Sequence, residues 1–398
     1  MKKAIILAGL QFGDEGKGSV TDFLTNHHKS KLVVRYNGGA QAAHNVVVNG
    51  KHFCFNQLSS GSIAGADTLL LDTMIVNPLQ LFREYKEYSA KFDRLPTIYI
   101  HENALITTPY HIYANRWKES KLKHGSCGMG VWETVEYERK YSVGFRISDL
   151  KLGIAAIESI LFVMLRTLRS ENRIENDDHE YDENYVNLMD DDWDDEFQEA
   201  GWTSLARWYY HVFLKMIHVV NDEQCRELLD KENVVVFEGA QGVLLDKDRG
   251  FLPHVSATDT TTHLAEAFLQ RIGWTGEIEK IGLLRSYVTR HGNGPLPSEV
   301  ENASIENEHN QYNEWQLGFR VGKFDLDLVK KALDICPVDS IFISCLDNDP
   351  FKPDDYVYNR ALELSGQIGI PLKGYSAGRE RSDKTLIYDN KKTTNIHI

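Results

Sequence analysis

The stretch Ala4-Ile-Ile-Leu-Ala-Gly-Leu-Gln-Phe-Gly-Asp-Glu-Gly-Lys-Gly-Ser19 decides the fold. It opens with an apolar run at 4–8, which predicts a strand buried on both faces and therefore lying inside a sheet. Several glycines and one lysine, Lys17, follow, and residues 19–24 are typical of a helix. A strand, a glycine-rich loop, a lysine and a helix form the order of a phosphate-binding loop. In such a loop, backbone N–H groups approach an anion and the lysine adds a positive charge.

The spacing of this loop differs from that of the standard P-loop. The standard pattern has four residues between its first glycine and the Gly-Lys pair, and a Ser or Thr follows the lysine. Here six residues separate Gly9 from Gly16, and a glycine follows the lysine. A tight strand-to-helix turn with a solvated lysine therefore stays an alternative. Asp14 and Glu15 would repel a phosphate unless a metal intervenes or one of them is a catalytic base.

Length and composition are those of a globular enzyme. A chain of 398 residues can bury a large core, as one large α/β domain or two smaller ones. The hydrophobic share of 42% and the charged share of 26% are ordinary values for soluble proteins. We expect neither a membrane span nor a signal peptide, because no apolar run is long enough and the N-terminus leads directly into a strand. The net charge of −14 argues against a nucleic-acid partner, but not against small anionic substrates.

The cysteines indicate a reducing compartment. The chain has five, at Cys54, Cys127, Cys225, Cys336 and Cys345, and no pair has the spacing of a zinc or redox site. An odd number of scattered cysteines favours free thiols, so we expect a cytoplasmic protein.

Strands and helices alternate along the whole chain, without a repeat or a linker. We expect strands at 31–36, 68–72, 97–100, 233–237, 281–288, 340–344 and 370–375, and helices at 78–91, 154–169, 202–221, from about 263, and at 324–335. A hairpin is predicted at 46–55, because Asn49-Gly50 is a strong turn signal. This order predicts an α/β fold in which residues 1–398 form a single large domain, with a mostly parallel central sheet flanked by helices. Residues 171–200, crowded with Asp and Glu, are interpreted as an acidic surface insertion.

Four further loops contain residues suited to ligand binding. Residues 37–44 are small and end in His44, and residues 124–134 contain three glycines. The three glycines of residues 124–134 would allow the backbone to approach a ligand closely, or they would make a flexible surface loop. Residues 238–242 follow a predicted strand, where α/β proteins bind ligands. Residues 254–262 are rich in hydroxyl groups, which could cap the following helix, bind phosphate, or do both.

Several loops together resemble the adenylosuccinate synthetase family. The similarity is carried by Gln11-Phe-Gly-Asp-Glu-Gly-Lys-Gly18, Arg35-Tyr-Asn-Gly-Gly-Ala-Gln-Ala-Ala-His44, Glu238-Gly-Ala-Gln-Gly-Val-Leu-Leu-Asp246, Thr289-Arg-His-Gly-Asn-Gly-Pro-Leu-Pro-Ser-Glu299 and the segment that begins at Ser376. These motifs span nearly the whole chain in the order of the family. The resemblance implies a ligase that hydrolyses GTP while it joins L-aspartate to C6 of IMP, through a 6-phosphoryl purine intermediate. It also implies Mg²⁺ and, usually, a homodimer.

The resemblance gives two residues catalytic roles. Asp14 would be the base that takes the proton from the purine N1, and His44 the acid that stabilises charge at O6 and at the transferring phosphoryl group. The chemistry agrees, because a carboxylate suits a proton that is being lost and an imidazole can donate toward a developing oxyanion. Mg²⁺ would bind at Asp14 and Ala43, and Lys17 would balance the phosphate charge.

The same resemblance implies a set of nucleotide-binding residues. They are Gly13, Glu15, Gly16, Lys17, Gly18, Gln41, Ser126, Cys127, Gln241, Ser256, Arg290, Arg320, Asp347, Ser376 and Gly378. Cys127 replaces a phosphate-binding threonine of the family, and Ser126 would share that role because a thiol is a poorer donor. Asp347 would read guanine, since a carboxylate can accept from both N1–H and N2–H, so we expect GTP rather than ATP.

The chain departs most from the family at Asn313-Glu-Trp-Gln-Leu-Gly-Phe-Arg320. The family has threonines and a run of arginines there, which hold the carboxylates of aspartate, and only Arg320 is kept. A phage-type branch of the family uses dGMP and replaces the catalytic aspartate by serine, whereas this chain retains Asp14. We therefore expect IMP. The alternatives are a (d)GMP ligase that forms 2-aminoadenylosuccinate with ATP or GTP, and a nucleotide-binding regulator without ligase activity.

Overall fold

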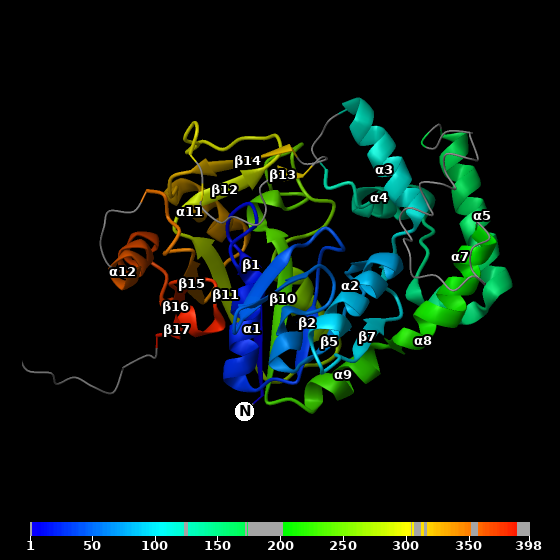
Figure 1. Ribbon diagram of the computed structural model, residues 1–398, viewed down its shortest axis with the longest axis horizontal. Coiled ribbons are helices and arrows are strands. Elements are labelled where there is room, and N and C mark those ends of the chain that lie inside the picture. The colour runs from blue at the N-terminus through cyan, green and yellow to red at the C-terminus, as the bar shows by residue number, and fades with distance from the viewer. Residues whose placement is uncertain are drawn as a thin grey trace, which may run out of the picture.

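A computed structural model describes residues 2–122, 126–171, 173, 202–303, 305, 312–313, 317–351 and 357–387. One large sheet runs through them (Figure 1). Its strands, in spatial order, are β17 (Lys384–Leu386), β16 (Leu372–Ser376), β15 (Ser340–Ser344), β11 (Glu277–Arg285), β1 (Lys3–Gly9), β10 (Val234–Gly242), β2 (Leu32–Arg35), β5 (Asp67–Leu70), β7 (Ile98–His101) and β9 (His218–Val220). Every pairing in this sheet is parallel except that of β16 with β17. The predicted α/β fold with a mostly parallel sheet is confirmed.

The first strand lies in the middle of this sheet, between β10 and β11. Its side chains alternate between two apolar layers. Ile5 and Leu7 pack in one cluster with α1 (Lys17–His28), while Ala4 and Ile6 pack in another with α9 (Asp222–Asp230) and α10 (His263–Arg271). Both faces of β1 are fully buried. The uninterrupted apolar run that opens the sequence follows from this position.

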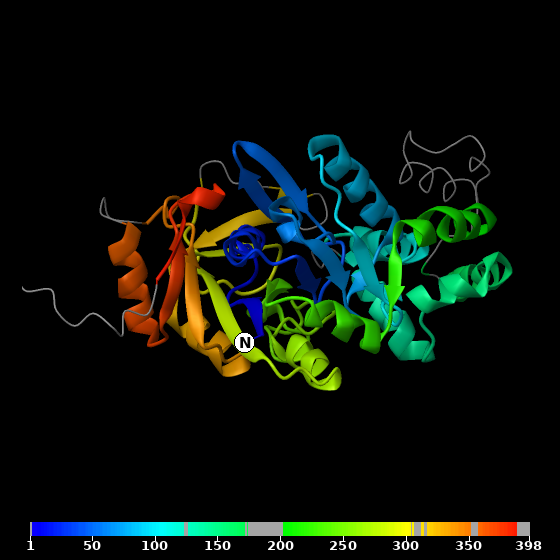
Figure 2. The ribbon, with the colours of Figure 1, turned by 90° about the horizontal axis from the view of Figure 1, so that it is seen from below.

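Helices cover both faces of the sheet (Figures 1 and 2). The view in Figure 2 shows α1 on one face, and α9 and α10 on the other. The remaining helices are α2 (Pro78–Lys91), α3 (Pro109–Leu122), α4 (Val131–Tyr141), α5 (Ile154–Ser170), α7 (Trp202–Trp208), α8 (Leu214–Met216), α11 (Leu326–Ile335) and α12 (Val357–Ile368). None of the helices in the described part of the chain combines the length and apolar character that a membrane span needs.

Small strand pairs lie outside the large sheet. The predicted hairpin is confirmed as β3 (His44–Val48) and β4 (Lys51–Phe55). Asn49 and Gly50 between them have φ of 52° and 75°, the left-handed conformation that a two-residue hairpin turn requires. The other pairs join β6 (Ile75–Val76) to β8 (Leu105–Ile106), and β14 (Leu317–Gly322) to β12 (Val288–His291) and β13 (Tyr312–Asn313).

Two predicted elements differ from the structure. The helix predicted at 202–221 is wrong at its end, because α8 stops at Met216 and residues 218–220 form the edge strand β9. The β-branched residues there pair with β7, and this long-range pairing overrides the local helical pattern. The strand predicted at 281–288 is in fact β11, which ends at Arg285, and a second strand, β12, which begins at Val288. The acidic insertion expected at about 171–200 lies, apart from Glu171 and Arg173, outside the described residues.

Candidate active site

The carboxyl ends of four neighbouring parallel strands open into one cavity of about 970 Å³. Residues 12–14 and 16–19 line it after β1, Gln241 comes from the end of β10, Arg285 from β11 and Ser344 from β15. This is the edge at which open α/β sheets bind ligands. The volume lies near the upper end of the range for small-molecule sites, roughly 300–1,000 Å³, so more than one substrate can be accommodated.

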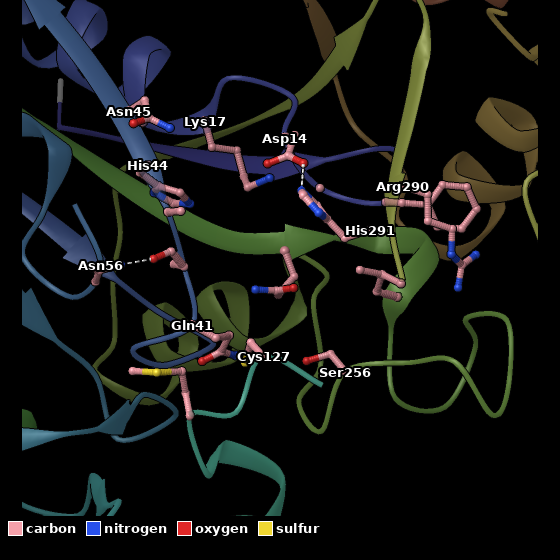
Figure 3. Close-up of a pocket in the computed structure, with 18 of the residues that line it drawn as sticks. Asp14, Lys17, Gln41, His44, Asn45, Asn56, Cys127, Ser256, Arg290 and His291 are labelled. Atoms are coloured by element: carbon pink, nitrogen blue, oxygen red, sulfur yellow. Dashed lines mark hydrogen bonds and ion pairs between the residues drawn. The ribbon is translucent and has the colours of Figure 1, made fainter. Parts of the chain in front are cut away.

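The cavity brings together nearly all of the residues predicted from the sequence. Those that line it are Gly13, Asp14, Gly16, Lys17, Gly18, Gln41, Ala43, His44, Ser126, Cys127, Gln241, Ser256, Arg290, Asp347, Ser376 and Gly378. They come from segments that are far apart in the sequence, and Figure 3 shows several of them directed toward a common space. Two predicted residues, Glu15 and Arg320, do not line the cavity, and both expectations need correction.

Glu15 shapes the phosphate loop from within. Its carboxylate is fully buried and accepts hydrogen bonds from the backbone N–H groups of Gln11 (3.0 Å) and Gly13 (2.9 Å). Its other oxygen lies 2.5 Å from Nζ of Lys17. The close approach explains the first glycine, since a Cβ on Gly9 would lie 2.2 Å from the Glu15 carboxylate. The Glu15 side chain therefore holds the loop and Lys17 in place and does not line the cavity.

The start of α1 points its backbone N–H groups toward the cavity. Gly16, the residue before the helix, has φ of 78°, and it lines the cavity together with Lys17 and Gly18. Gly18 packs directly on the hairpin, because a Cβ there would lie 2.6 Å from Cβ of His44. Unpaired N–H groups and the partial positive charge at a helix N-terminus suit an anion. The arrangement is compatible with the predicted phosphate-binding loop, which stays a prediction.

Asp14 faces the cavity from a strained backbone conformation. Its φ is 62°, and its carbonyl oxygen accepts a hydrogen bond from Nε of Arg285. Oδ2 of Asp14 lies 3.2 Å from Nε2 of His291 (Figure 3). Burial alone would raise the pKa of Asp14, but the hydrogen bond from His291 and the charges of His291, Arg285 and Lys17 outweigh it. The pKa of Asp14 is therefore held below its usual range, and the carboxylate is ionised at neutral pH.

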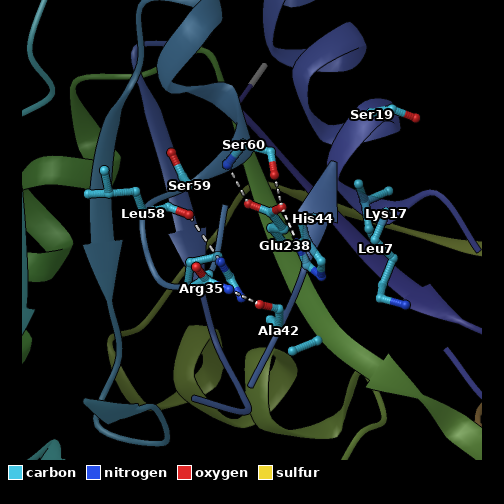
Figure 4. A network of polar contacts seen from close by, with 12 residues as sticks. Leu7, Lys17, Ser19, Arg35, Ala42, His44, Leu58, Ser59, Ser60 and Glu238 are labelled. Carbon is cyan, nitrogen blue, oxygen red and sulfur yellow. Dashed lines mark hydrogen bonds and ion pairs between the residues drawn. The ribbon is translucent and has the colours of Figure 1, made fainter. Parts of the chain in front are cut away.

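His44 belongs to a buried polar network (Figure 4). Its Nδ1 lies 2.6 Å from Oε1 of Glu238, which also accepts from the hydroxyl of Ser60. The second oxygen of Glu238 accepts from the backbone N–H of Ser60 at 3.0 Å. A carboxylate beside Nδ1 places the ring hydrogen on that atom and leaves Nε2 for the other side of the ring. Glu238 thereby fixes the tautomer and the orientation of His44.

Burial and charge act in opposite directions on this network. Burial lowers the pKa of His44, and the contact with Glu238 offsets part of that change. Burial would raise the pKa of Glu238, but the nearby guanidinium of Arg35 and the bond with His44 hold it below its usual range. Arg35 is itself fully buried and donates from Nη1 to the carbonyl of Leu58 at 3.1 Å. The network thus keeps an anionic Glu238 between an imidazole and a buried cation.

Three strained backbone positions lie at the cavity. Among the described non-glycine residues with left-handed φ, Asp14, Gln241 (63°) and Cys345 (57°) all line it. Each such conformation costs roughly 1–3 kcal/mol and persists only where the surrounding structure enforces it. Strain at three separate strand ends around one space is typical of a functional site.

The segment near the end of the described chain that carries Ser376 and Gly378 is bound to both α1 and the β3–β4 hairpin. Arg381 binds Asp22 of α1 through two hydrogen bonds, of 2.7 and 2.6 Å. At the tip of the β3–β4 hairpin, the carboxylate of Glu380 accepts hydrogen bonds from the backbone N–H groups of Asn49 (3.0 Å) and Gly50 (2.9 Å). The segment therefore lies in a defined position relative to both Lys17 and His44.

Of the two predicted arginines, Arg290 is the one that lines the cavity. It donates to the carbonyls of Pro295 (2.8 Å) and His254 (3.2 Å), and its guanidinium lies 4.2 Å from the centre of the Phe12 ring. Burial, with the charge of Arg320 adding to it, lowers the pKa of Arg290 to about 10. Arg290 therefore remains a cation at neutral pH.

Arg320 lies behind the cavity wall. Its Nη1 forms an ion pair of 2.9 Å with Glu299, and its Nη2 donates to the carbonyl of Gly294 at 2.7 Å. The ligand contact expected of Arg320 is therefore not supported by its position. Through these two contacts, Arg320 holds the loop that follows β12.

The sequence analysis missed several residues that line the cavity. They include Asn45, Asn56, Arg285, Tyr287, His291 and Arg379. Arg285 lies inside the strand predicted at 281–288, whereas the structure ends β11 at Arg285, at the edge where α/β sites gather. His291 lies inside the quoted motif at 289–299, but nothing in the sequence places it beside Asp14.

The helices α3 and α4 contribute the loop with Ser126 and Cys127. The hydroxyl of Ser126 exchanges hydrogen bonds with the amide of Asn115, at 3.0 and 3.1 Å. Burial raises the pKa of the Cys127 thiol to about 11, so the thiol stays neutral and keeps its hydrogen. The thiol of Cys127 can donate a weak hydrogen bond to an anion, whereas the single hydroxyl hydrogen of Ser126 is already donated to Oδ1 of Asn115.

The donor set suits a magnesium ion that is shared with substrate phosphates. Within the described ranges, no group of three or more His, Cys, Asp or Glu side chains could hold a metal by itself. Mg²⁺ usually keeps several waters and is bound by one or two carboxylates together with substrate phosphates. Asp14 offers one ionised carboxylate next to the phosphate loop, and Ala43 can offer only its backbone carbonyl.

The fold and the cavity define an α/β protein with a phosphate loop and a nucleotide-sized site. The family model of adenylosuccinate synthetase matches residues 6–349. An adenylosuccinate synthetase from Thermoplasma volcanium is 31% identical over 87% of this chain and 76% of its own length. One from Borrelia recurrentis is 29% identical over 86% of this chain and 76% of its own length. The chain belongs to the adenylosuccinate synthetase family, and it is a ligase of purine nucleotide biosynthesis.

Two solved structures share the fold. A fully ligated adenylosuccinate synthetase from Plasmodium falciparum has a TM-score of 0.74 at 20% identity, covering 96% of this chain and 99% of its own. The succinoaminodeoxyadenylate synthetase of cyanophage S-2L, bound to dGMP and dATP, has a TM-score of 0.68 at 16% identity, covering 97% and 95%. At these identities the likeness concerns the fold.

Proposed function

We propose that this ligase joins L-aspartate to C6 of a purine nucleoside monophosphate, IMP, with GTP as the phosphoryl donor and Mg²⁺ as the cofactor. One observation carries the proposal. An ionised carboxylate, Asp14, and an oriented imidazole, His44, line the same cavity as the phosphate loop with Lys17. A base and an acid beside a phosphate site are what phosphoryl transfer to a purine oxygen needs.

The first step transfers a phosphoryl group to O6. Asp14 takes the proton from N1 of the purine, and the electron pair of that bond shifts so that O6 becomes a nucleophile. O6 then forms a bond to the γ-phosphorus of GTP, the bond from that phosphorus to the bridging oxygen breaks, and GDP leaves. For this step His44 acts as an imidazolium: Nδ1–H is bound to Glu238, and Nε2–H donates a hydrogen bond toward the charge that develops on O6 and on the phosphoryl group.

The second step replaces the phosphoryl group by aspartate. The amine of aspartate forms a bond to C6, inorganic phosphate leaves with its oxygen, and the amine nitrogen loses a proton. The product is adenylosuccinate if the purine is that of IMP. Hydrogen bonding from His44 favours departure of the phosphate, because it stabilises the negative charge on the leaving oxygen.

The phosphates of the donor are assigned to the loop before α1. The N–H groups of residues 16–18 and the ammonium of Lys17 supply positive charge at the cavity wall. Asp14 and the carbonyl of Ala43 would hold Mg²⁺. The ion, when bound, neutralises phosphate charge in the transition state.

The donor base is assigned to the wall formed by Asp347, Ser376 and Gly378. A carboxylate accepts from the two adjacent donors of guanine, N1–H and N2–H, whereas adenine offers no such pair. GTP is therefore the preferred donor. For the carboxylates of aspartate we assign Arg290, because it lines the cavity while Arg320 is bound to Glu299. We also propose a cytoplasmic homodimer.

A second candidate is a ligase that acts on dGMP or GMP with ATP or GTP, and forms 2-aminoadenylosuccinate. It is favoured by the fold neighbour from cyanophage S-2L, which was solved with dGMP and dATP. Retention of Asp14, which the phage-type branch replaces by serine, favours the inosine base in the first candidate. Guanine carries the same N1–H, so the two candidates share their first step and differ in the substituent at C2.

A substrate matrix separates the candidates. Purified protein is incubated with IMP, GMP or dGMP, with GTP or ATP, and with aspartate or other amino acids, and products are identified by mass. Adenylosuccinate formation with IMP, GTP and aspartate, absent when any of them is omitted, is the expected result. Products from dGMP alone would favour the second candidate. Binding of nucleotides without turnover in any combination would show a regulator and refute the ligase.

A further inference from the structure

His291 stands at the reacting centre without an assigned role. It ends β12, where it pairs in register with Phe319 of β14. The two rings pack with their centres 5.0 Å apart. Its side chain is 19% exposed and lines the cavity. A rigid strand and an aromatic neighbour therefore determine where this imidazole points.

The ring makes one polar contact on the cavity side. Nε2 lies 3.2 Å from Oδ2 of Asp14, and the two side chains point toward each other (Figure 3). Nδ1 is buried and has no hydrogen-bond partner among the described residues. A hydrogen on Nδ1 would be a buried donor without an acceptor, so the favoured tautomer carries its hydrogen on Nε2. His291 is thus a donor directed at the carboxylate.

Asp14 requires such support because of where it lies. It belongs to a glycine-rich loop, its φ is 62°, and its neighbour Gly13 has φ of 103°. Arg285 holds the backbone of Asp14 through the carbonyl oxygen, which leaves the side-chain torsion to other contacts. The terminal torsion of an aspartate has a broad energy minimum, so its carboxylate plane turns easily when nothing holds it. A base that must meet N1 of the purine needs a fixed plane.

We propose that His291 is a positioning residue for the base of this ligase: its Nε2–H holds Oδ2 of Asp14 and so aims the carboxylate at the purine N1. The role deepens the proposed function and rests on it. His291 does not touch the transferred proton, and Asp14 alone accepts it. The effect is one of geometry, since a misplacement of about 1 Å at a reacting atom can cost on the order of 10²-fold in rate.

Three substitutions separate the donor from the packing. His291→Leu keeps an apolar side chain against Phe319 but removes the donor. His291→Gln keeps an N–H at about the reach of Nε2. His291→Asn keeps an amide whose shorter side chain cannot reach Asp14, and it serves as the second donor-free variant if His291→Leu fails to fold. His211→Leu is the control, because His211 is exposed and lies outside the residues that line the cavity.

The readouts are kcat, KM and phosphoryl transfer alone. Transfer is followed without aspartate, as exchange of ¹⁸O between bridging and non-bridging positions of the β- and γ-phosphates of the donor. We expect His291→Leu and His291→Asn to lower kcat and the exchange rate by about 10²-fold, with KM for the monophosphate changed by less than about threefold. His291→Gln should recover most of the loss, and all variants should unfold at similar temperatures.

Three results would overturn the proposal. They are donor-free variants within about twofold of wild type, a His291→Gln variant as slow as His291→Leu, and a slow overall reaction with unchanged isotope exchange. A wild-type protein that shows no turnover in the substrate matrix would instead refute the proposed function. The two failures are therefore distinguishable, because the first is measured only against an active wild type.

Discussion

Glu238→Gln tests whether the buried network controls catalysis through His44. The substitution keeps the shape of the side chain and replaces one carboxylate oxygen by an NH₂ group. In the wild type all three groups around this carboxylate donate to it: Nδ1 of His44 (2.6 Å), the hydroxyl of Ser60 and the N–H of Ser60 (3.0 Å). An amide presents only one acceptor to these three donors. At least one donor then loses its partner, or His44 changes its tautomer.

The magnitude follows from these contacts. A hydrogen bond to a charged group contributes about 1.5–3 kcal/mol, and a buried donor left without an acceptor costs about 1–3 kcal/mol. Together they predict a loss of roughly 2.5–6 kcal/mol in the free energy of unfolding, to which the uncompensated guanidinium of Arg35 adds. Catalysis should suffer more, because an imidazole in the wrong tautomer cannot donate from Nδ1 to residue 238 while Nε2 acts in the cavity. Loss of an oriented acid–base group costs about 10²–10⁴-fold in kcat.

The assay is steady-state turnover with the substrates identified by the matrix, together with urea unfolding. We expect kcat to fall by at least 10²-fold while KM for the nucleotides stays within a few fold, because the phosphate loop and the base-binding wall are untouched. Glu363→Gln on α12 is the matched control, since Glu363 is solvent-exposed and contacts Arg360 and Gln367 of its own helix, outside the cavity lining. A Glu238→Gln variant with kcat within tenfold of wild type would refute the argument.

Three further outcomes are expected. Asp14→Asn should lower kcat by about 10²–10⁴-fold and leave the circular dichroism spectrum unchanged, because it removes a base from a loop held by other bonds; near-normal turnover would exclude Asp14 as the base. Asp347→Asn should reduce the ratio of kcat/KM for GTP to that for ATP by about tenfold or more, since one acceptor becomes a donor; an unchanged ratio would show that Asp347 does not read the base. Burial raises the pKa of Glu84 to about 7, so the folded state retains a proton there that the unfolded state releases. The free energy of unfolding should therefore fall as pH rises from about 4.5 to about 7, by up to roughly 3 kcal/mol relative to Glu84→Gln; parallel pH profiles of the two proteins would contradict this.

The central strands and the hairpin could be predicted because their signals are local. Residues 4–8 and 341–343 are apolar without interruption, as expected of strands that are covered on both faces. Asn49-Gly50 sets a two-residue turn by its own conformational preference. The order of the strands could not be predicted in this way. β10 lies between β1 and β2 because of packing between segments more than two hundred residues apart, and no short window of sequence contains that information.

For the site as well, local motifs were predictable and long-range contacts were not. Asp14, Lys17 and His44 were identified from motifs, and all three line the cavity. Their partners were not identified, because Glu238, His291 and Arg285 reach them only after the strands assemble. A motif can identify the candidate reacting group. The contacts that fix the orientation of that group come from residues elsewhere in the chain.

The two carboxylates of the phosphate loop show why this distinction matters for electrostatics. Read in sequence, Asp14 and Glu15 are neighbouring charges that would both repel a phosphate. In the structure they point in opposite senses, because Asp14 takes a left-handed backbone conformation while Glu15 turns inward onto Lys17 and the N–H groups of the loop. The loop thereby hides one negative charge and exposes the other to a cavity wall that also carries Arg285 and Arg290. A protein with a net charge of −14 can in this way present locally balanced charge to an anionic substrate and still retain one ionised carboxylate as a base.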